Sequence, residues 1–366
     1  MKFRCERQAL ADALGTAVRA SGGRTASSPA LAGVRLEVKG DTLTIACTDS
    51  DQIINCSVPV QGITNGISVP RAKLLNEIVR SLSDGAVELE VVGEDIVVRG
   101  GRSSFNVPTY MAQDFQMLPP AAAPDTKVNA KEFAEALRQV GPARRMGSDD
   151  NKFTKFNGIQ ISHDADGIWV SATDGYRMAL RSLPHSDIIG VGEHLIVPGD
   201  ALSELTGMLS NVSELIVRWA DPTITFIAGS ATLTTRTITG QLPDAAMFRT
   251  MSYDNVLTIN RDKFLEALRR ARIVLPARRG LRLHCGPGGV RIEAADRDLG
   301  RIDEDLEGNY VGDEIMVSFN IDYLISAVEV VDTEDVRILA GDPRKQVIVR
   351  AADSDDYSCY IMPIKA

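Results

Sequence analysis

The chain has 366 residues, which is too long for one ordinary hydrophobic core and suits two or three domains. Hydrophobic residues make up 44% and charged residues 24%, which is typical of a folded globular protein and excludes disordered and collagen-like chains. The formal net charge of -9 argues against a protein that coats nucleic acid with a uniformly basic surface.

The cysteines predict neither a disulfide framework nor a zinc site. There are five (Cys5, Cys47, Cys56, Cys285 and Cys359), and they are scattered without a CxxC motif. The sequence also shows no signal peptide and no run of about 18 to 20 apolar residues. We therefore expect a cytoplasmic protein that does not enter a membrane.

The first third of the chain predicts helices and strands in a definite order. An amphipathic helix is expected over residues 7–18, followed by alternating strands over 33–38 and 41–51. A second helix is expected within 67–82, and further strands within 87–108.

The same order returns twice. The middle third predicts a helix at 130–140, strands at 158–164 and 167–177, a helix within 195–209 and strands within 214–240. The last third predicts a helix at 261–274, strands at 281–286 and 289–298, a helix within 315–331 and strands within 335–364. Asp49, Asp174 and Asp296 end equivalent strands, and their spacing of about 120 residues is that of a whole domain.

These repeats predict three domains of one α+β fold. We place them at residues 1–120, 126–245 and 253–366, joined by linkers near 118–125 and 243–253. The charges are segregated, because residues 261–282 are mostly basic and residues 301–314 mostly acidic.

Four segments match a known family. They are GRSSFNVPT at 101–109, QDFQMLP at 113–119, TDGYRMAL at 173–180 and YIMPIK at 360–365. With the three tandem units, they make the whole chain resemble the bacterial sliding clamp, the DNA polymerase III beta subunit. The resemblance implies the DNA-clamp fold, in which each domain packs two helices on antiparallel sheets. It also implies a head-to-tail homodimer that closes a ring of six domains.

The resemblance further implies a processivity factor that is not an enzyme and needs no cofactor or metal. The ring would encircle duplex DNA without reading its sequence and slide along it at the nucleoid. Its partners would be DNA polymerase III alpha, other polymerases, the clamp loader and repair proteins that carry clamp-binding peptides.

Three sets of residues carry these expected roles. The partner-peptide pocket between the middle and last domains would comprise Phe156, Thr173, Gly175, Tyr176, Arg177, Met178, Leu180, Pro243, Met247, Phe248, Tyr360, Ile361, Met362, Pro363 and Ile364. The DNA-facing residues would include Arg24, Arg71, Lys73, Arg80, Arg138, Arg144, Arg145, Lys152, Arg278 and Arg279. The dimer interface would join Lys73, Arg102 and Phe105 to Ile273, Val274, Asp303, Glu304 and Asp305.

The sequence departs from the family at three places. Tyr176 replaces a common histidine, PDAAMF at 243–248 replaces a more aromatic and basic pattern, and Gly199-Asp200 stands where basic residues are usual. These departures leave open an accessory peptide-binding scaffold that is not loaded on DNA. For the apolar pocket residues, the alternative is ordinary core packing.

An enzyme is the least favoured alternative. The histidines (His163, His185, His194 and His284) lack the HExxH spacing, and no GxxxxGK[ST] loop is present. The HDADG segment lacks the full pattern of a calcium loop, and a hairpin turn explains it better. The sequence therefore offers no catalytic set.

Overall fold

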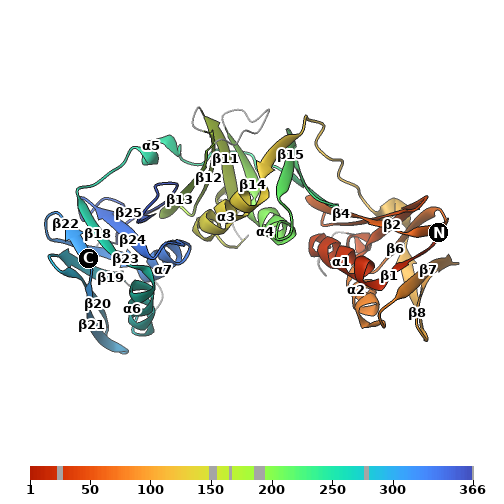
Figure 1. The fold of residues 1–366 in the computed structure, drawn as a ribbon, viewed down its shortest axis with the longest axis horizontal. Coiled ribbons are helices and arrows are strands. Elements are labelled where there is room, and N and C mark those ends of the chain that lie inside the picture. Colours follow the sequence, from red (N-terminus) through yellow and green to blue (C-terminus); the bar gives the residue numbers. More distant parts are fainter. Residues whose placement is uncertain (23–27, 148–154, 165–166, 185–193, 276–279, 365–366) are drawn as a thin grey trace. The chain divides into compact units, whose positions relative to one another are not determined.

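The computed structural model describes residues 1–22, 28–147, 155–164, 167–184, 194–275 and 280–364, which form two compact units (Figure 1). The first unit contains Met1–Lys131 and Asp200–Thr237. The second contains Glu132–Ser186, Val191–Gly199 and Ile238–Ala366. Each unit has its own buried core, which includes Phe3 and Phe226 in the first and Phe264 and Phe319 in the second.

The described residues form seven α-helices, and the sequence predicts all of them except the short one at Ala246–Arg249. They are α1 (Arg7–Ala17), α2 (Ala72–Ser81), α3 (Ala130–Val140), α4 (Gly199–Met208), α5 (Ala246–Arg249), α6 (Arg261–Ile273) and α7 (Ile321–Glu329), with short 3-10 turns η1 (Val18–Ala20), η2 (Pro29–Ala32), η3 (Ala112–Asp114) and η4 (Gly141–Ala143). Asn260 caps α6, because its Oδ1 accepts the N–H of Lys263 at 3.1 Å. Figure 1 shows α1 beside α2 in the first unit and α6 beside α7 in the second.

The first unit is built on one antiparallel sheet of thirteen strands. Its order is β10-β15-β16-β17-β4-β3-β2-β6-β9-β8-β7-β1-β5. The strands are β1 (Lys2–Glu6), β2 (Arg35–Lys39), β3 (Thr42–Thr48), β4 (Gln52–Pro59), β5 (Gln61–Thr64), β6 (Gly66–Pro70), β7 (Ala86–Val92), β8 (Asp95–Gly100), β9 (Ser103–Tyr110), β10 (Thr126–Asn129), β15 (Glu214–Ala220), β16 (Thr223–Ala228) and β17 (Ala231–Arg236).

The second unit has a nine-stranded and a four-stranded antiparallel sheet. Their orders are β14-β11-β12-β13-β26-β25-β24-β18-β22 and β21-β20-β19-β23. The strands are β11 (Gly158–Asp164), β12 (Gly167–Thr173), β13 (Arg177–Leu183), β14 (His194–Pro198), β18 (Asn255–Asn260), β19 (Gly280–Gly286), β20 (Gly289–Asp296), β21 (Gly300–Glu307), β22 (Asn309–Val311), β23 (Ile315–Asn320), β24 (Asp335–Ala340), β25 (Val347–Ala351) and β26 (Tyr357–Ile361).

The two large sheets run across the predicted linkers. β17 of the predicted middle domain pairs with β4, and β26 of the predicted last domain pairs with β13. The compact units therefore divide the predicted middle domain between them, and the boundaries at 120, 126, 245 and 253 stay a prediction. Both predicted linkers are packed, since Leu118, Ala121, Leu242 and Ala245 are buried.

The three sequence repeats share one turn. Asp49, Asp174 and Asp296 each stand at the end of an equivalent strand, and each uses Oδ1 to accept two backbone N–H groups ahead of it in the chain. The donors are Asp51 and Gln52 at 3.0 and 2.9 Å, Tyr176 and Arg177 at 2.9 and 3.1 Å, and Asp298 and Leu299 at 2.8 and 3.2 Å. Such turns reverse the chain with local bonds alone.

Candidate functional site

The pairing of β26 with β13 brings most of the predicted pocket residues together. Met178 lies opposite Tyr360, and Arg177 lies opposite Ile361. The residues that follow β26 then run past the turn between β12 and β13. The N–H of Met362 donates to the carbonyl of Tyr176 at 2.9 Å.

The turn at 173–177 places Tyr176 at the rim of the site. The Thr173 hydroxyl donates to the Arg177 carbonyl at 2.6 Å, and the Gly175 N–H donates to Thr173 Oγ1 at 3.0 Å. Gly175 has a φ of 93°, which a residue with a side chain adopts only at a cost. The Tyr176 side chain is not absorbed into the fold, because 66% of the residue is exposed.

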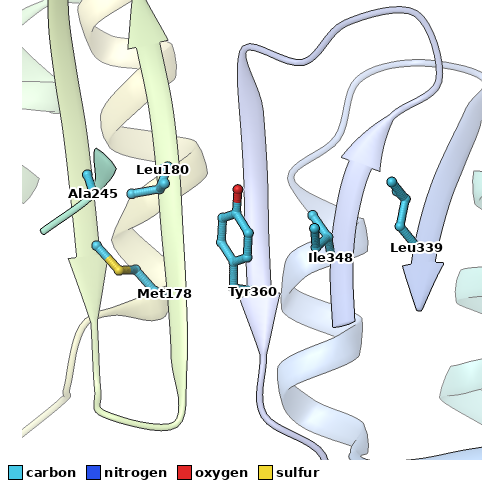
Figure 2. Packing of buried hydrophobic residues seen from close by; sticks show 6 residues of the cluster. All are labelled: Met178, Leu180, Ala245, Leu339, Ile348 and Tyr360. Carbon is cyan, nitrogen blue, oxygen red and sulfur yellow. The ribbon is translucent and has the colours of Figure 1, made fainter. Parts of the chain in front are cut away.

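A buried apolar cluster lies beneath this rim. Its members are Met178, Leu180, Ala245, Leu339, Ile348 and Tyr360. Figure 2 shows the Tyr360 ring between Met178 and Leu180 of β13 on one side and Ile348 of β25 on the other. Tyr360 is only 2% exposed and Met178 only 3% exposed. Met178 and Tyr360 therefore pack in the core of this sheet, and their role in a peptide pocket stays a prediction.

The segment 242–253 covers this cluster. Ala245 joins the cluster directly, and the ring of Phe248 meets Tyr360 edge to face with 5.2 Å between ring centroids. The guanidinium of Arg249 stacks on the Trp169 ring of β12 at 4.3 Å from its centroid. Residues 242–253, which include the predicted second linker, therefore form a cover over the cluster.

The predicted pocket residues separate by exposure. Thr173, Met178, Leu180, Tyr360 and Ile361 are buried; Gly175, Tyr176, Pro243, Met247 and Met362 are exposed; Phe156, Arg177, Phe248, Pro363 and Ile364 are intermediate. Phe156 is not a member of the cluster and lies before β11 with Lys155 Nζ 5.4 Å from its ring centroid. The accessible part of the site is therefore a rim of large side chains above a filled core.

Arg177 acts as an internal clasp. Its guanidinium donates to Asp174 Oδ2 at 3.1 Å and also to the Ser326 hydroxyl and the Pro142 carbonyl. It lies over the Tyr323 ring at 4.4 Å from the centroid, and its side chain is only 12% exposed. Arg177 therefore joins β13 to α7 and η4. Arg177 is also one of the predicted pocket residues, and that role stays a prediction.

In the first unit, β17 and β4 meet at a second junction of strands. Its backbone pairing is the same as that of β26 and β13, but its side chains differ. Where β26 sets Tyr360 opposite Met178, β17 sets Thr234 opposite Ile53. The Thr234 hydroxyl is hydrogen-bonded to that of Thr225 at 2.9 Å, and both residues are buried. Because these buried threonine hydroxyls are hydrogen-bonded to each other, they offer little contact surface to an apolar ligand.

The backbone equivalence of the two junctions extends to the chain after each strand. The N–H of Arg236 donates to the carbonyl of Asp51 at 3.0 Å, as the N–H of Met362 donates to Tyr176. Asp51 therefore stands where Tyr176 stands, and Arg236 where Met362 stands. At these two positions the junction of β4 and β17 therefore has charged residues where the junction of β13 and β26 has Tyr176 and Met362.

The predicted DNA-facing residues fall into three groups. Arg71, Lys73 and Arg80 are exposed on or beside α2, Arg138 is on α3, and Arg144 and Arg145 follow η4. Arg24, Lys152, Arg278 and Arg279 lie outside the described residues. Arg138 is already paired, because its Nη2 donates to Glu135 and Asp332, each at 2.6 Å, and to the Val330 carbonyl at 3.0 Å.

The predicted interface residues lie on or near α2 and β9 in the first unit and on or near α6 and β21 in the second. Lys73, Arg102 and Phe105 are exposed on or near α2 and β9. In the second unit, Asp303, Glu304 and Asp305 lie on β21, and Ile273 ends α6 with 76% of its surface exposed and Val274 following it. Two of the acidic residues form ion pairs within the second unit. Asp303 pairs with Arg291 and Arg301, and Glu304 pairs with Arg270.

Within the described residues, no cluster of three or more His, Cys, Asp or Glu side chains could hold a metal ion. A groove of about 560 Å³ opens beside His284, Arg291 and Met316, away from the rim of Tyr176, and we assign it no role. None of the helices described between residues 1 and 364 is both long and apolar enough to cross a membrane.

Comparison with known families covers nearly the whole chain. Three models of the DNA polymerase III beta subunit match it: the N-terminal domain at residues 1–119, the central domain at 127–244 and the C-terminal domain at 251–365. Two curated proteins called beta sliding clamp are similar over the full length of both chains. That of Caulobacter vibrioides is 29% identical, and that of Pseudomonas aeruginosa is 28% identical.

Solved structures give the same result. The DNA polymerase III subunit beta from Pseudomonas aeruginosa superposes with a TM-score of 0.93 at 26% identity and covers 100% of both chains. The beta sliding clamp from C. crescentus superposes with a TM-score of 0.92 at 25% identity and covers 100% of this chain and 99% of its own.

Proposed function

Because this chain belongs to the family of DNA polymerase III beta subunits, the sliding clamps, we propose that it is a processivity factor that works as a closed dimeric ring. The ring encircles duplex DNA and slides on it. Replicative and other polymerases, the clamp loader and repair proteins dock on it through short peptides. The chain itself is an accessory subunit without catalysis, and it acts at the nucleoid in the cytoplasm.

The junction of β13 and β26 is the observation that carries the docking proposal. It gathers residues from two predicted domains into one surface whose exposed members are Tyr176, Met247 and Met362. Methionine side chains adapt to varied ligands, and an exposed aromatic ring supplies contact area. At the equivalent junction, the charged residues Asp51 and Arg236 stand in the places of Tyr176 and Met362. An extended apolar peptide is therefore expected to prefer the junction of β13 and β26 to that of β4 and β17.

The open edges of β9 and β21 support the ring. Of the described strands, only β8 pairs with residues 103–108 of β9, and β21 ends its sheet. Phe105 lies opposite Val98 and so shares its core-facing side. On β21 the core-facing side carries Ile302, Glu304 and Leu306, of which Glu304 is paired with Arg270. Pairing the two edges between copies would remove two exposed edges and join their apolar faces. Two such head-to-tail contacts close a ring.

Peptide docking is tested by two matched variants. We expect Met362→Ala to weaken binding of a clamp-binding peptide from a polymerase by about tenfold, because it removes an exposed apolar contact. Arg236→Ala changes the equivalent residue at the junction of threonines and should leave binding unchanged. Equal binding by wild type and both variants, measured by fluorescence anisotropy, would reject this site.

The ring is tested by its topology. The protein is loaded on nicked circular DNA by a matching clamp loader with ATP, washed in high salt, and then released by cutting the circle. Charge contacts fade with salt, whereas a closed ring leaves only from a free end. Survival in salt followed by release on cutting is the expected result. Loss in the salt wash would instead leave a peptide-binding scaffold that is not loaded.

A further inference from the structure

A cleft lies between α1 and the end of β4 in the first unit. Its volume is about 280 Å³; α1 lines it with Asp12, Ala13 and their neighbours, β4 with Cys56 and the residues after it, and the turn before β17 with Ser230. Asp12 is the charged side chain of this lining. Its Oδ1 accepts the side-chain amide of Gln8 at 2.8 Å, and among the residues that the structure describes it has no ion-pair partner.

The helix beside this cleft has a counterpart at the junction of β13 and β26. The first residue of α1, Arg7, donates its N–H to the carbonyl that directly precedes β7, at 2.9 Å. The first residue of α3, Ala130, donates its N–H to the carbonyl that directly precedes β15, at 3.1 Å. The two helices therefore begin at equivalent points of their domains. Counting from these points, Asp12 of α1 corresponds to Glu135 of α3.

The strands beside the cleft correspond as well. The residue after Cys56 on β4 donates its N–H to the Ser230 carbonyl at 3.0 Å. The residue after Arg181 on β13 donates its N–H to the Asp356 carbonyl at 2.8 Å. Cys56 therefore stands where Arg181 stands, and Ser230 stands where Asp356 stands.

At the junction of β13 and β26, this place is filled by the side chain of Arg181. Its Nη1 lies 3.4 Å from Asp356 Oδ2, and the side chain is only 19% exposed. Burial raises the pKa of the Glu135 carboxyl, but hydrogen bonds and the charges of Arg138 and Arg181 bring it below its usual value. The Arg181 guanidinium is thus held by one carboxylate on the turn and is attracted by another on the helix.

The junction of β4 and β17 keeps one of these carboxylates but lacks the arginine. Cys56 is much shorter than Arg181, and burial raises the pKa of its thiol to about 12, so it carries no charge at neutral pH. Ser230 in place of Asp356 removes the carboxylate of the turn. The cleft is therefore the space that a long cationic side chain fills at the other junction, and Asp12 remains there as a counter-charge.

We propose that this cleft binds the guanidinium of an arginine side chain that a partner protein presents. The ligand takes the place that Arg181 has at the other junction, with its alkyl chain along Ala13 and its planar guanidinium paired with the Asp12 carboxylate. Such a side chain can enter from outside, because Asp12 and Ser230 are exposed. The site is separate from the docking surface at Tyr176, and its test does not depend on peptide docking there.

Alanine methyl groups in the intact protein provide the readout by NMR. Argininamide supplies the guanidinium without a carboxylate of its own, and citrullinamide is its neutral control of the same shape. Ala13 and Ala231 line the cleft, so their methyl signals should shift with argininamide, with a dissociation constant in the low-millimolar range. Ala136 corresponds to Ala13 on α3 and is fully buried, so its signal should stay in place.

Two variants at exposed positions should change the affinity in opposite directions. Asp12→Asn keeps the shape of the side chain but removes its charge, and we expect it to weaken argininamide binding by about tenfold. Ser230→Asp supplies the carboxylate that Asp356 supplies at the other junction, and we expect it to tighten binding by about fivefold. Thermal melting of both variants checks that the fold is kept. Lysinamide should bind more weakly than argininamide, because an ammonium group lacks the planar fork.

Shifts with argininamide that Asp12→Asn weakens and Ser230→Asp strengthens support the arginine site. Equal shifts with citrullinamide would show that the cleft accepts the alkyl chain alone, and equal affinity for lysinamide that it accepts any cation; each result overturns the proposal. So does binding that Asp12→Asn leaves unchanged, or the absence of shifts at concentrations well above the millimolar range. A blocked Ala-Arg-Ala peptide presents the same group on a protein chain and should bind at least as tightly as argininamide. Weaker binding of this peptide would overturn a partner protein as the source of the arginine.

Discussion

At the scale of single residues, Arg177 is a predicted pocket residue whose guanidinium makes its hydrogen bonds within the fold. Its guanidinium serves Asp174, Ser326 and Pro142 at once and is almost fully buried. Removing it leaves a partly buried carboxylate without its cation. We expect Arg177→Ala to lower the free energy of unfolding by about 3 kcal/mol.

The control for this prediction is Arg344→Ala. Arg344 pairs with Asp342, but its side chain is 88% exposed. An exposed pair contributes little, so the change should cost less than about 1 kcal/mol. Chemical denaturation of both variants checks the difference. Similar small losses for the two variants would show that Arg177 is not a structural clasp.

The buried thiols predict how stability changes with pH. Burial raises the pKa of Cys285 to about 12, so the folded chain keeps this proton in mild alkali. An unfolded cysteine ionises near pH ~8.5. Above that pH the unfolded state binds fewer protons than the folded state. Stability from this group is therefore complete below it and declines as pH rises toward the folded pKa.

Cys285→Ala isolates this effect. The variant has no thiol to ionise, so its stability should fall less than that of wild type between pH 7 and pH 10, by about 2 kcal/mol. Urea unfolding at the two pH values measures the difference between the proteins, in which the titration of all other groups cancels. A constant difference across this range would mean that the thiol ionises equally in both states.

At the scale of elements, the repeated turn offers an internal comparison of backbone strain. Ser50 and Gly175 occupy the same place and have φ values of 89° and 93°, but only one is glycine. A side chain in this region costs about 1 kcal/mol. We therefore expect Ser50→Gly to raise the melting temperature and Gly175→Ser to lower it. A Cβ at Gly175 would meet no other atom within 4 Å, so strain alone is tested. Shifts of equal sign would contradict this account.

The sequence predicted best those helices and strands whose apolar residues recur at a regular spacing. The long helices and the hairpins follow from apolar spacing and turn residues. The strands β1, β10 and β18 before the first helix of each domain were missed. Each has only four to six residues, and each pairs with a strand far along the chain: β7, β15 and β24. Local alternation carries too little signal at this length.

The sequence predicted only part of the site, because only part of it has a distinctive local sequence. The turn at Tyr176 and the tail at Met362 have distinctive sequence, and β26 brings them together. The cover was taken for a linker, because Ala245 and Phe248 are isolated apolar residues in a segment with proline and polar neighbours. Their burial depends on Tyr360, more than a hundred residues away. The predicted roles of the site residues remain to be tested by binding.

At the scale of the whole molecule, the charge on the helices qualifies the expected grip on DNA. α6 has the densest basic face, but Arg269, Arg270 and Arg272 pair with Glu329, Glu304 and Asp322. Paired cations release fewer counterions from DNA than free ones. Retention by a closed ring would then matter more than affinity. Closure therefore becomes the property on which the proposed function depends.

The strength of ring closure is predicted to rest on Phe105. It is 36% exposed on the open part of β9, and an arginine there would replace an apolar ring by a charge that must pack against Ile302 and Leu306 of the facing edge. We expect Phe105→Arg to raise the dimer dissociation constant at least a hundredfold, about 3 kcal/mol. Ile63→Arg is the control, because Ile63 is 53% exposed on β5 at the end of the same sheet.

Sedimentation at submicromolar concentration distinguishes the two variants. Phe105→Arg should sediment as a monomer and Ile63→Arg as a dimer, with unchanged melting of the separate chains. A dimer in both cases would place the interface elsewhere than on β9 and β21. A monomer in both would show that any arginine on this sheet disrupts association. Only the first pattern ties closure to the edge where Phe105 continues the core-facing side of Val98 and leaves it open to a second copy.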